Sequence, residues 1–578
     1  MSKYSPTSEQ HDIIDCDDDL LVTAVPGSGK TKTVIDKVEK LAKTVSDKNI
    51  IVITYTYRAA DEVAERLSNR NIDSDNVWTG TIHGFCLEHV LNPNLSLIPE
   101  LSRGYDIADE DDIKKIERHC ADVLSINLGY YDSVNLSLDV NGKLEENDPS
   151  KKKVAQAVYE YLKENKMISF DQILYYAYEI LLKHNYLARN IAYGTEWIII
   201  DEYQDTKELQ YQIISEIAKK TKTVKLMFVG DPNQAIYTSL GGVVKDLTQL
   251  NALMHREFKV KSLTGCFRSA QRIIDFYSLF ACAPEQIESK TSNYPTPIVK
   301  YFTDISVDRE KFGLFAKEHI DDFHNLGIDY SDMCVALPWN VHLMHLSSWF
   351  LRNAPHIPVD SPTVTPLKKM DDGIWNNLVR MLFVTFTYNN IFYYERMVRN
   401  SLKEIERRFG ADCTKKTDKL LDYYISCRFD DDLTATKIIE TEANKIFSEI
   451  IGLSADIYKP SVDFLLDATK EKLKRYATQL EDTVECFKQC YKSKNGVVFT
   501  TFHGCKGEEY RGVVVGGLNE GYVPHKTRVS YREDSMRLLY VVMSRAKEKL
   551  IISSKKPDYR GEYLINNEIS KCNFQYDL

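Results

Sequence analysis

The sequence lacks any long uninterrupted apolar run. A membrane-spanning helix needs about 18 or more consecutive apolar residues, and no segment of the 578-residue chain reaches that length. The first residues, MSKYSPTSEQHDIIDCDDD, also lack the apolar core of a secretory signal. We therefore expect a cytoplasmic protein without a membrane partner.

Cysteine spacings typical of metal sites are missing too. The 12 cysteines are scattered singly, and the pair Cys486 and Cys490 has no second pair or histidines at the spacing of a zinc or iron–sulfur site. The chain also lacks an excess of basic residues, since its formal net charge is −10. This charge argues against a protein that coats nucleic acid over its whole surface, but it allows a locally basic groove.

Short apolar segments that end in glycine or acidic residues recur early, in the middle and late in the chain. Examples are LLVTAVPGSGK, WIIIDEYQD and KLMFVGDPNQ, and longer helical stretches separate them. This alternation is typical of a parallel sheet with crossover helices, so the sequence predicts an α/β fold. At ~100 to 200 residues per domain, the length fits several domains.

Two stretches lack the strand pattern and are predicted to be mainly helical. The simplest layout is therefore two α/β lobes, each with a parallel sheet, flanking helices and a helical insertion. No internal repeat or long low-complexity tract favours another architecture. The predicted boundaries are residues 1–88 and 196–266 for the first lobe, 89–195 for its insertion, 267–371 and 491–578 for the second lobe, and 372–490 for the second insertion.

A phosphate-binding loop is predicted between the first apolar run and the first long helix. The segment AVPGSGKT has the strand, loop and helix context that such a loop needs. Its backbone N–H groups would surround the β-phosphate of ATP, Lys30 would reach the β- and γ-phosphate oxygens, and the Thr31 hydroxyl would bind Mg²⁺. The predicted nucleotide-binding residues of this loop are Ala24, Val25, Pro26, Gly27, Ser28, Gly29, Lys30 and Thr31.

Two adjacent carboxylates complete the predicted hydrolysis site. Asp201 and Glu202 follow the apolar run WIII, where a buried strand would deliver them to the same sheet edge as the phosphate loop. One carboxylate, assigned to Asp201, would hold Mg²⁺ with Thr31, and the other would activate water. Acidic pairs at strand ends are often only solvated, but beside a phosphate loop this pair predicts hydrolysis and not binding alone.

These motifs, in this order, resemble those of the UvrD, Rep and PcrA group of superfamily 1 helicases. AVPGSGKT is similar to the family's AGAGSGKT, TYTYRAADEV to TFTNKAAEEM, GTIHGFC to GTFHSFC, and DEYQDT to DEFQDT. Later segments match as well: VGDPNQAIY resembles VGDDDQSIY, CFRSAQRI resembles NYRSTQNI, TTFHGCKGEEY resembles TIHAAKGLEF, and RLLYVVMSRAKEKL resembles RLLYVAITRAKERL. The resemblance covers nearly the whole chain. It implies two RecA-like lobes and an ATP-driven motor on single-stranded DNA with 3′-to-5′ polarity.

The resemblance also implies roles for residues outside the phosphate loop. Gln234 would sense the γ-phosphate, and Arg268 and Arg545 would act from the second lobe as arginine fingers, which neutralise charge on the transferred phosphoryl group. The remaining implied contacts with the nucleotide are Gln10 at the adenine edge, Phe267 and Lys32 on the two adenine faces, and Glu509 near the ribose.

Single-strand binding requires aromatic faces beside a basic track. The resemblance implies DNA contacts by Tyr55, Thr81, His83, Phe85, Tyr237 and His503. The chain departs from the family at Ser239 and Leu240, where a stacking Trp and an Arg are usual. One base stack and one cationic contact are therefore missing, which predicts a weaker grip on the strand.

Two functions stay open. The first is an ATP-dependent DNA helicase that separates strands, for example in a tailed duplex. The second is a DNA-stimulated ATPase that serves as a sensor or regulatory subunit beside a nuclease in a DNA-repair or phage-defence complex, without robust unwinding.

The second insertion is short and has no glycine-rich helix–hairpin–helix segment, and the chain ends soon after RLLYVVMSRAKEKL. We therefore expect any cutting activity to belong to a partner. A P-loop kinase or GTPase unrelated to nucleic acid is disfavoured, because it needs neither DEYQD nor two fingers.

Overall fold

The chain folds into two compact units in its computed structural model. Unit 1 comprises Met1–Phe267 and Glu285–Glu288, and unit 2 comprises Arg268–Pro284 and Ser289–Leu578. The described residues are 5–45, 47–68, 70, 76–108, 110–129, 133–238, 241–283, 286–303, 305, 310–361, 367, 374–384, 386, 391–475, 481–491, 496–518, 531–554, 569 and 574–577. Within these ranges, no helix is both long and apolar enough to cross a bilayer.

Unit 1 is built on a six-stranded parallel sheet with the strand order β3-β2-β6-β7-β1-β8. Short runs of aliphatic and β-branched residues form these strands, as in NIIVIT of β2 and TEWIIID of β6. Their bounds are Leu20–Ala24 for β1, Asn49–Thr54 for β2, Val77–Thr81 for β3, Thr195–Asp201 for β6, Lys225–Gly230 for β7 and Lys259–Leu263 for β8.

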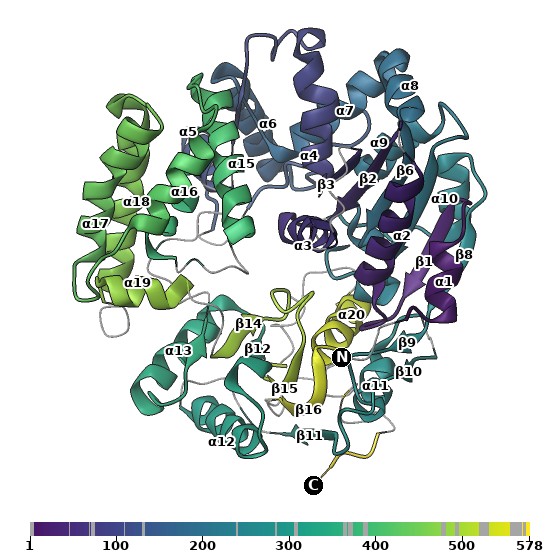
Figure 1. The fold of residues 1–578 in the computed structure, drawn as a ribbon, viewed down its shortest axis with the longest axis vertical. Coiled ribbons are helices and arrows are strands. Elements are labelled where there is room, and N and C mark those ends of the chain that lie inside the picture. Colours follow the sequence, from purple (N-terminus) through teal and green to yellow (C-terminus); the bar gives the residue numbers. More distant parts are fainter. Residues whose placement is uncertain are drawn as a thin grey trace. The chain divides into compact units, whose positions relative to one another are not determined.

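Helices cover both faces of the unit 1 sheet (Figure 1). Because successive side chains of a strand point to opposite faces, Leu20 and Val22 pack with α1 and α2 in one core, whereas Leu21 packs in a second core with α7 and α9. Such two-sided burial explains why the strands are almost entirely apolar. The helices of the lobe are α1 (Ser8–Ile14), α2 (Lys30–Thr44), α3 (Tyr57–Ser68), α9 (Glu208–Ala218) and α10 (Leu247–Met254).

The segment between β3 and β6 is mainly helical. Its helices α5 and α6 form a small core of their own with Ile116 and Val158, whereas α7 packs into the larger core of the sheet. The elements are α4 (Ile82–Phe85), α5 (Glu110–Val123), α6 (Pro149–Glu164), α7 (Phe170–Lys183), α8 (Asn185–Tyr193) and the paired strands β4 (Asp106–Ile107) and β5 (Met167–Ile168).

Unit 2 contains a second six-stranded parallel sheet, with the order β11-β16-β15-β12-β14-β13. Helices α12 and α13 pack on it through a core that includes Phe312 and Phe350. The strands are β11 (Ile298–Phe302), β12 (Met333–Leu337), β13 (Val359–Asp360), β14 (Val497–Thr501), β15 (Tyr510–Val515) and β16 (Ala546–Ser553). The helices of this lobe are α11 (Gln271–Tyr277), α12 (Lys311–Asn325), α13 (Asn340–Asn353) and α20 (Tyr531–Met543).

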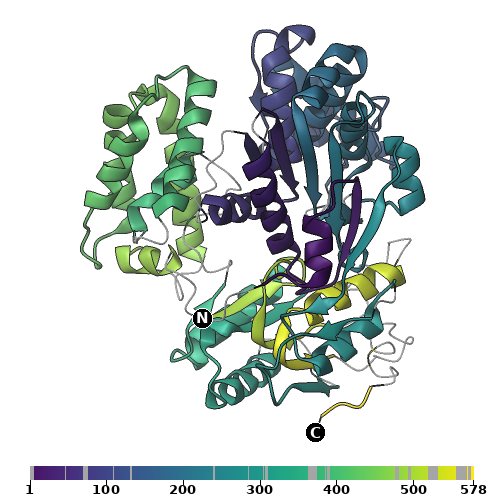
Figure 2. The ribbon, with the colours of Figure 1, turned by 45° about the vertical axis from the view of Figure 1, so that its right-hand side comes forward.

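The helical segment between β13 and β14 is drawn in green in Figure 2. It has a separate core, which includes Trp375 and Phe447. Its helices are α14 (Ile374–Arg380), α15 (Ile391–Phe409), α16 (Lys416–Ser426), α17 (Ala435–Ala443), α18 (Ala455–Arg475) and α19 (Val484–Tyr491). The predicted fold class, an α/β protein with two RecA-like lobes that each carry a mainly helical insertion, is confirmed.

Candidate functional site

The phosphate loop connects β1 to α2 in unit 1. Gly27 and Gly29 have φ angles of 73° and 79°, which L side chains rarely adopt. Ser28 is buried, and its hydroxyl has no hydrogen-bond partner within the protein. Buried polar atoms are nearly always paired. The Ser28 hydroxyl therefore suits a loop that binds a ligand oxygen.

Lys30, the first residue of α2, lies between two carboxylates. Its Nζ atom is 3.2 Å from Oδ1 of Asp201 and also donates a hydrogen bond to Glu202. Burial opposes the charged amine, but the two carboxylates outweigh it and raise the pKa of Lys30. Burial also raises the pKa of Asp201, although Lys30 partly offsets this effect. The structure therefore brings together the three charged groups of unit 1 that the sequence assigns to hydrolysis.

The acidic pair sits where β6 ends. Asp201 is the last residue of the strand, and Glu202 has a φ of 55°, in the left-handed region. The backbone N–H of Glu202 donates to Oδ1 of Asp201 at 2.9 Å. A non-glycine residue in this conformation costs of order 1–3 kcal/mol and persists only where its surroundings fix it. The turn aims both carboxylates towards the Lys30 amine.

A buried hydrogen-bond network leads from this acidic pair to Gln234. The Gln204 amide donates to Glu202, and its Oε1 accepts from the backbone N–H of Asp231 at 3.1 Å. Gln234 then donates from Nε2 to Oδ2 of Asp231 at 2.8 Å. Burial raises the pKa of Asp231 to about 6. A Cβ atom at Gly230 would overlap Oε1 of Gln204, so glycine is required there.

Gln204 and Asp231 were not assigned roles from the sequence. Both lie inside motifs that had been recognised, DEYQDT and VGDPNQ, next to the residues that were assigned. Their positions in these motifs could have indicated a hydrogen-bonding role, because a buried Gln or Asp beside a hydrolysis site must find a polar partner.

Gln10 lies in α1 and contacts the phosphate loop. Its Nε2 donates to the Ser28 carbonyl at 3.2 Å, and its Oε1 accepts from the Thr7 backbone N–H at 3.0 Å, in a capping box. Both polar atoms of the amide are therefore used within the protein. In this structure Gln10 supports the loop, and the contact with adenine that the resemblance implies stays a prediction.

Phe267, Lys32 and Thr31 lie at the same loop. The Phe267 backbone N–H donates to the Gly27 carbonyl at 2.8 Å, and 41% of the residue is exposed. Lys32 and Thr31 are half-buried in the first turn of α2, and burial lowers the pKa of Lys32. Among the described residues, no three or more His, Cys, Asp or Glu side chains are grouped to hold a metal. Mg²⁺ at Thr31 and Asp201 would need water or phosphate oxygens as further ligands, which is how this ion usually binds.

Unit 2 brings its assigned residues together in a cationic cluster. Glu509 Oε2 lies 2.7 Å from Arg268 Nε, and Glu509 Oε1 lies 3.0 Å from Lys547 Nζ. Burial acts to raise the pKa of Glu509, but the two cations outweigh it and hold that pKa at about 2. Arg268 also donates to the Ser544 carbonyl at 3.2 Å, and Arg545 donates to the Ser544 hydroxyl at 2.9 Å.

The Arg545 guanidinium is fixed by backbone carbonyls. Its Nε donates to Val541 at 2.9 Å and its Nη1 to Glu508 at 3.2 Å. Glu508 precedes Glu509, so hydrogen bonds and ion pairs link Arg268, Arg545 and Glu509 into one cluster of unit 2. His503 is half-buried in the turn that follows β14, in the loop that also carries Glu508 and Glu509.

Two predicted DNA contacts form an aromatic pair in unit 1. The rings of Tyr55 and Tyr237 are stacked, with centroids 5.1 Å apart and planes 21° apart. Tyr55 is 37% exposed, and burial of its hydroxyl raises its pKa, which keeps the phenol neutral. This pair offers an uncharged stacking surface of the kind that binds bases without sequence preference.

Thr81 and Phe85, two of the predicted DNA contacts, make local contacts within unit 1. The Thr81 hydroxyl caps α4 by accepting from the Gly84 backbone N–H at 3.2 Å, and the residue is buried. Phe85 is fully buried, with its ring edge against Trp78 at a centroid distance of 5.8 Å. Both side chains are used in local contacts, and their contact with DNA stays a prediction.

His83 is half-buried, with its ring edge-on to that of Phe170 at 5.5 Å. Burial lowers the pKa of His83 to about 4, against the attraction of Asp171. The imidazole is therefore neutral at physiological pH and could offer DNA a hydrogen bond or a ring face but no charge. The departures at Ser239 and Leu240 lie outside the described residues.

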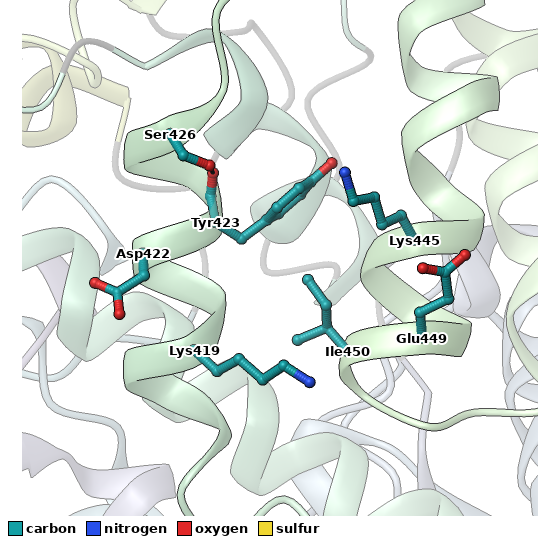
Figure 3. A pocket seen from close by; sticks show the side chains of 7 residues that line it. All are labelled: Lys419, Asp422, Tyr423, Ser426, Lys445, Glu449 and Ile450. Atoms are coloured by element: carbon teal, nitrogen blue, oxygen red, sulfur yellow. Dashed lines mark hydrogen bonds between the residues drawn. The ribbon is translucent and has the colours of Figure 1, made fainter.

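A surface hollow is present in the second helical segment, between α16 and residues 444–450 (Figure 3). The Lys445 Nζ atom lies 4.7 Å from the centre of the Tyr423 ring. Lys419, Asp422 and Glu449 also line the hollow. Charges of both signs are mixed there, so the hollow favours no ligand of a single charge sign.

The parallel sheet, the phosphate loop at the end of β1 and the carboxylate pair at the end of β6 define a RecA-like P-loop nucleoside triphosphatase. Residues 7–255 match the UvrD/REP helicase N-terminal domain, and residues 393–557 match the UvrD-like helicase C-terminal domain. The chain belongs to the UvrD/Rep family of helicases.

Relatives cover most of the chain at low identity. A probable DNA helicase II homolog of Mycoplasma capricolum is 22% identical over 98% of this chain and 86% of its own length. A probable DNA helicase II homolog of Mycoplasma pneumoniae is 25% identical, over 92% and 81% of the two chains. The ATP-dependent DNA helicase PcrA of Staphylococcus epidermidis is 22% identical, over 93% and 81%.

Proposed function

We propose that the chain is an ATP-dependent DNA helicase that translocates along single-stranded DNA in the 3′-to-5′ direction and couples ATP hydrolysis to strand separation. The observation that carries this proposal is the Lys30 amine between Asp201 and Glu202, linked by hydrogen bonds to Gln234. Membership of the UvrD/Rep family and relatives named as DNA helicases support it. The polarity rests on the family resemblance.

ATP and Mg²⁺ fit the residues of the loop. The unpaired Ser28 hydroxyl and the Lys30 amine suit phosphate oxygens, and Thr31 with Asp201 would hold Mg²⁺. When bound, Mg²⁺ neutralises charge on the phosphates and orients them. Glu202, whose carboxylate lies beside Lys30, would accept a proton from the attacking water.

The remaining ATP contacts are proposed from motif position. Arg268 and Arg545 would stabilise charge on the transferred phosphoryl group, an effect worth ~10³- to 10⁵-fold in other P-loop enzymes. Glu509, which now pairs with Arg268, would meet the ribose. Phe267 and Lys32 would enclose the adenine, with Gln10 at its edge.

Coupling between hydrolysis and DNA is proposed to run through residues 231–237. Asp231 and Gln234 belong to the network that begins at the acidic pair, and Tyr237, three residues on, stacks on Tyr55. A change at Glu202 on phosphate loss would therefore reach Gln234 through hydrogen bonds and Tyr237 along the chain that follows Gln234. We propose Tyr55, Thr81, His83, Phe85, Tyr237 and His503 as the DNA contacts.

We also propose that the functional domains follow the predicted boundaries, with the ATP site in residues 1–88 and 196–266 and the arginine fingers in 267–371 and 491–578. Residues 89–195 and 372–490 would be the insertions that adjust contact with duplex or partner. The separate cores of α5 with α6 and of α14 to α19 support this division, whereas α7 and α8 pack into the core of the unit 1 sheet.

An alternative function is a DNA-stimulated ATPase that senses DNA or regulates a nuclease-containing repair or defence complex. The observation that favours it is the replacement of a stacking Trp and an Arg by Ser239 and Leu240. Each lost base stack removes ~1–3 kcal/mol of strand affinity, which unwinding needs more than sensing does.

ATP hydrolysis by the purified chain, with and without single-stranded DNA, tests the proposal together with strand displacement from 3′-tailed and 5′-tailed duplexes. We expect DNA to stimulate hydrolysis and the strand to be released only from the 3′-tailed duplex. Release only from the 5′-tailed duplex contradicts the polarity. Stimulation without release favours the alternative, and hydrolysis that DNA does not affect contradicts both.

A further inference from the structure

Trp339 is an exposed aromatic residue of unit 2 that follows the carboxyl end of β12. All five tryptophans of the chain lie within the described residues, and 42% of Trp339 is exposed, whereas Trp197, Trp349 and Trp375 are buried and Trp78 is half-buried. A single exposed apolar side chain is common, so exposure alone assigns no role. The surroundings of Trp339 add three further observations.

The first observation is that the ring is held in place. The His342 imidazole stacks on the Trp339 indole, with centroids 5.9 Å apart and planes 21° apart. The His342 backbone N–H also donates to the Trp339 carbonyl at 3.1 Å, in the first turn of α13. A ring that is already oriented loses little conformational freedom when a second flat ring stacks on it.

The second observation concerns the strand ends. In the parallel pair of β12 and β14, Leu337 is paired with Thr501, and the Phe502 N–H donates to the Leu337 carbonyl at 3.1 Å (Figure 1). Trp339 and His503 each lie two residues beyond these paired positions, so both follow the same carboxyl edge of the sheet. Ligands of open parallel sheets bind outside this edge.

The third observation is the charge of the two segments that leave this edge. Residues 338–353, which follow β12, contain no Asp or Glu, although the chain has 84 acidic residues and a formal net charge of −10. Residues 502–509, which join β14 to β15, contain Lys506 and also Glu508 and Glu509, and Glu509 is paired with Arg268 and Lys547. A polyanion would therefore meet little repulsion from the segment that follows β12.

We propose that Trp339 is a base-stacking residue for the single strand, on the second lobe. This inference rests on the proposed function, since it names a further contact for the same nucleic acid. Trp339 would supply an aromatic face in a chain that has Ser239 where the family has a stacking Trp. The ligand is an unpaired base, held by its flat face and therefore without sequence preference.

Intrinsic fluorescence tests the inference directly, because Trp339 is the one exposed indole among the five described tryptophans. The full chain is titrated with an oligothymidylate, and tryptophan emission is followed beside the anisotropy of a labelled copy of the same oligonucleotide. We expect emission to be quenched as the strand binds, and most of this quenching to be lost in Trp339→Phe. Trp339→Ala should weaken binding by ~10-fold, and Trp339→Phe by less, because phenylalanine keeps a smaller ring.

Tyr186→Ala serves as the matched control, since Tyr186 is an aromatic residue that is 54% exposed in the segment between β3 and β6. Its substitution should leave strand affinity unchanged. If the strand binds but emission is equally quenched in the wild type and in Trp339→Phe, the inference is overturned while the proposed function stands. If the strand neither binds nor stimulates hydrolysis, both the proposed function and the inference are contradicted. Unchanged affinity of Trp339→Ala for the strand also overturns the inference and favours contact of this surface with a protein partner.

Discussion

The rings of Tyr55 and Tyr237 stack with their centroids 5.1 Å apart, although the residues are far apart in sequence. Tyr55 follows β2, and Tyr237 follows the segment that carries Gln234. The pair therefore joins two motifs of unit 1 into one aromatic surface next to the network that leads from the hydrolysis site.

Tyr55→Ala should raise the DNA concentration needed for half-maximal ATPase activity by ~10-fold, because one base stack is lost. Tyr55→Phe should stay near the wild type, because it keeps the ring and removes only the hydroxyl. The measurement is ATPase rate against concentration of single-stranded DNA. Equal curves for Tyr55→Ala and the wild type would place Tyr55 off the DNA path.

Lys30→Ala should lower ATP turnover by at least ~100-fold without unfolding the protein, since it removes a charge that stabilises phosphate oxygens. Lys43→Ala, at a lysine in the last turn of the same helix with 67% of its side chain exposed, is the control and should keep full activity. Steady-state hydrolysis and circular dichroism check both variants. Substantial turnover in Lys30→Ala would contradict the phosphate-loop assignment.

The juxtaposition of Lys30, Asp201 and Glu202 could be predicted from the sequence because both motifs end apolar strands of one parallel sheet. Carboxyl ends of parallel strands meet at one edge, so a glycine-rich loop after β1 and two acids at the end of β6 had to lie close together. The two-lobe α/β fold followed from the same alternation of apolar runs and helices.

Burial of individual aromatic and polar residues could not be predicted in this way. GTIHGFC places His83 and Phe85 two residues apart, but only the packing against Trp78 decides that Phe85 belongs to the core. Gln10 likewise has a motif position, yet its amide is used by Thr7 and Ser28. A motif gives the identity of a residue and its place in the chain, whereas its free surface depends on tertiary contacts.

Gln204→Leu should impair both stability and coupling. The substitution leaves the backbone N–H of Asp231 without its acceptor, which costs about 1–3 kcal/mol of unfolding free energy. It also breaks the link from Glu202 to Gln234, so DNA should stimulate hydrolysis less than in the wild type. Chemical denaturation and the ratio of ATPase rates with and without DNA measure the two effects. Gln212→Leu, on half-buried Gln212 of α9, is the control for loss of a glutamine amide.

Lys37→Met tests a buried lysine that was not singled out from the sequence. Its Nζ donates to the carbonyls of Ile13 at 3.2 Å and Cys16 at 2.7 Å, and lies 4.2 Å from the Trp197 ring centre. These carbonyls lie at the end of α1, the helix that carries Gln10 to the phosphate loop.

Removing the amine should therefore cost about 1–3 kcal/mol of unfolding free energy, through carbonyls left without a donor. Lys40→Met is the matched control on the same helix, because 41% of the Lys40 side chain is exposed and its ion pair with Asp15 at 3.3 Å is a surface pair of small energetic value. Thermal or denaturant unfolding compares the two variants. Equal stability of both variants would show that the Lys37 hydrogen bonds are not needed to hold α1.

His83 should make the stability of the protein depend on pH between about 4 and 6.5. Burial lowers its pKa to about 4 in the folded protein from an ordinary value of 6.5, while Asp171 opposes and Lys207 adds to this shift. The unfolded chain therefore binds the proton first as the pH falls, so the contribution of neutral His83 is complete above pH 6.5 and is lost towards pH 4. Over this window the wild type should lose up to ~1.4 kcal/mol of unfolding free energy per pH unit more than His83→Gln. Parallel slopes for the two proteins would mean that His83 titrates alike in the folded and unfolded states.

At neutral pH the imidazole is uncharged, so His83→Gln should leave the salt dependence of DNA binding unchanged, because that dependence counts only the cations that neutralise phosphates.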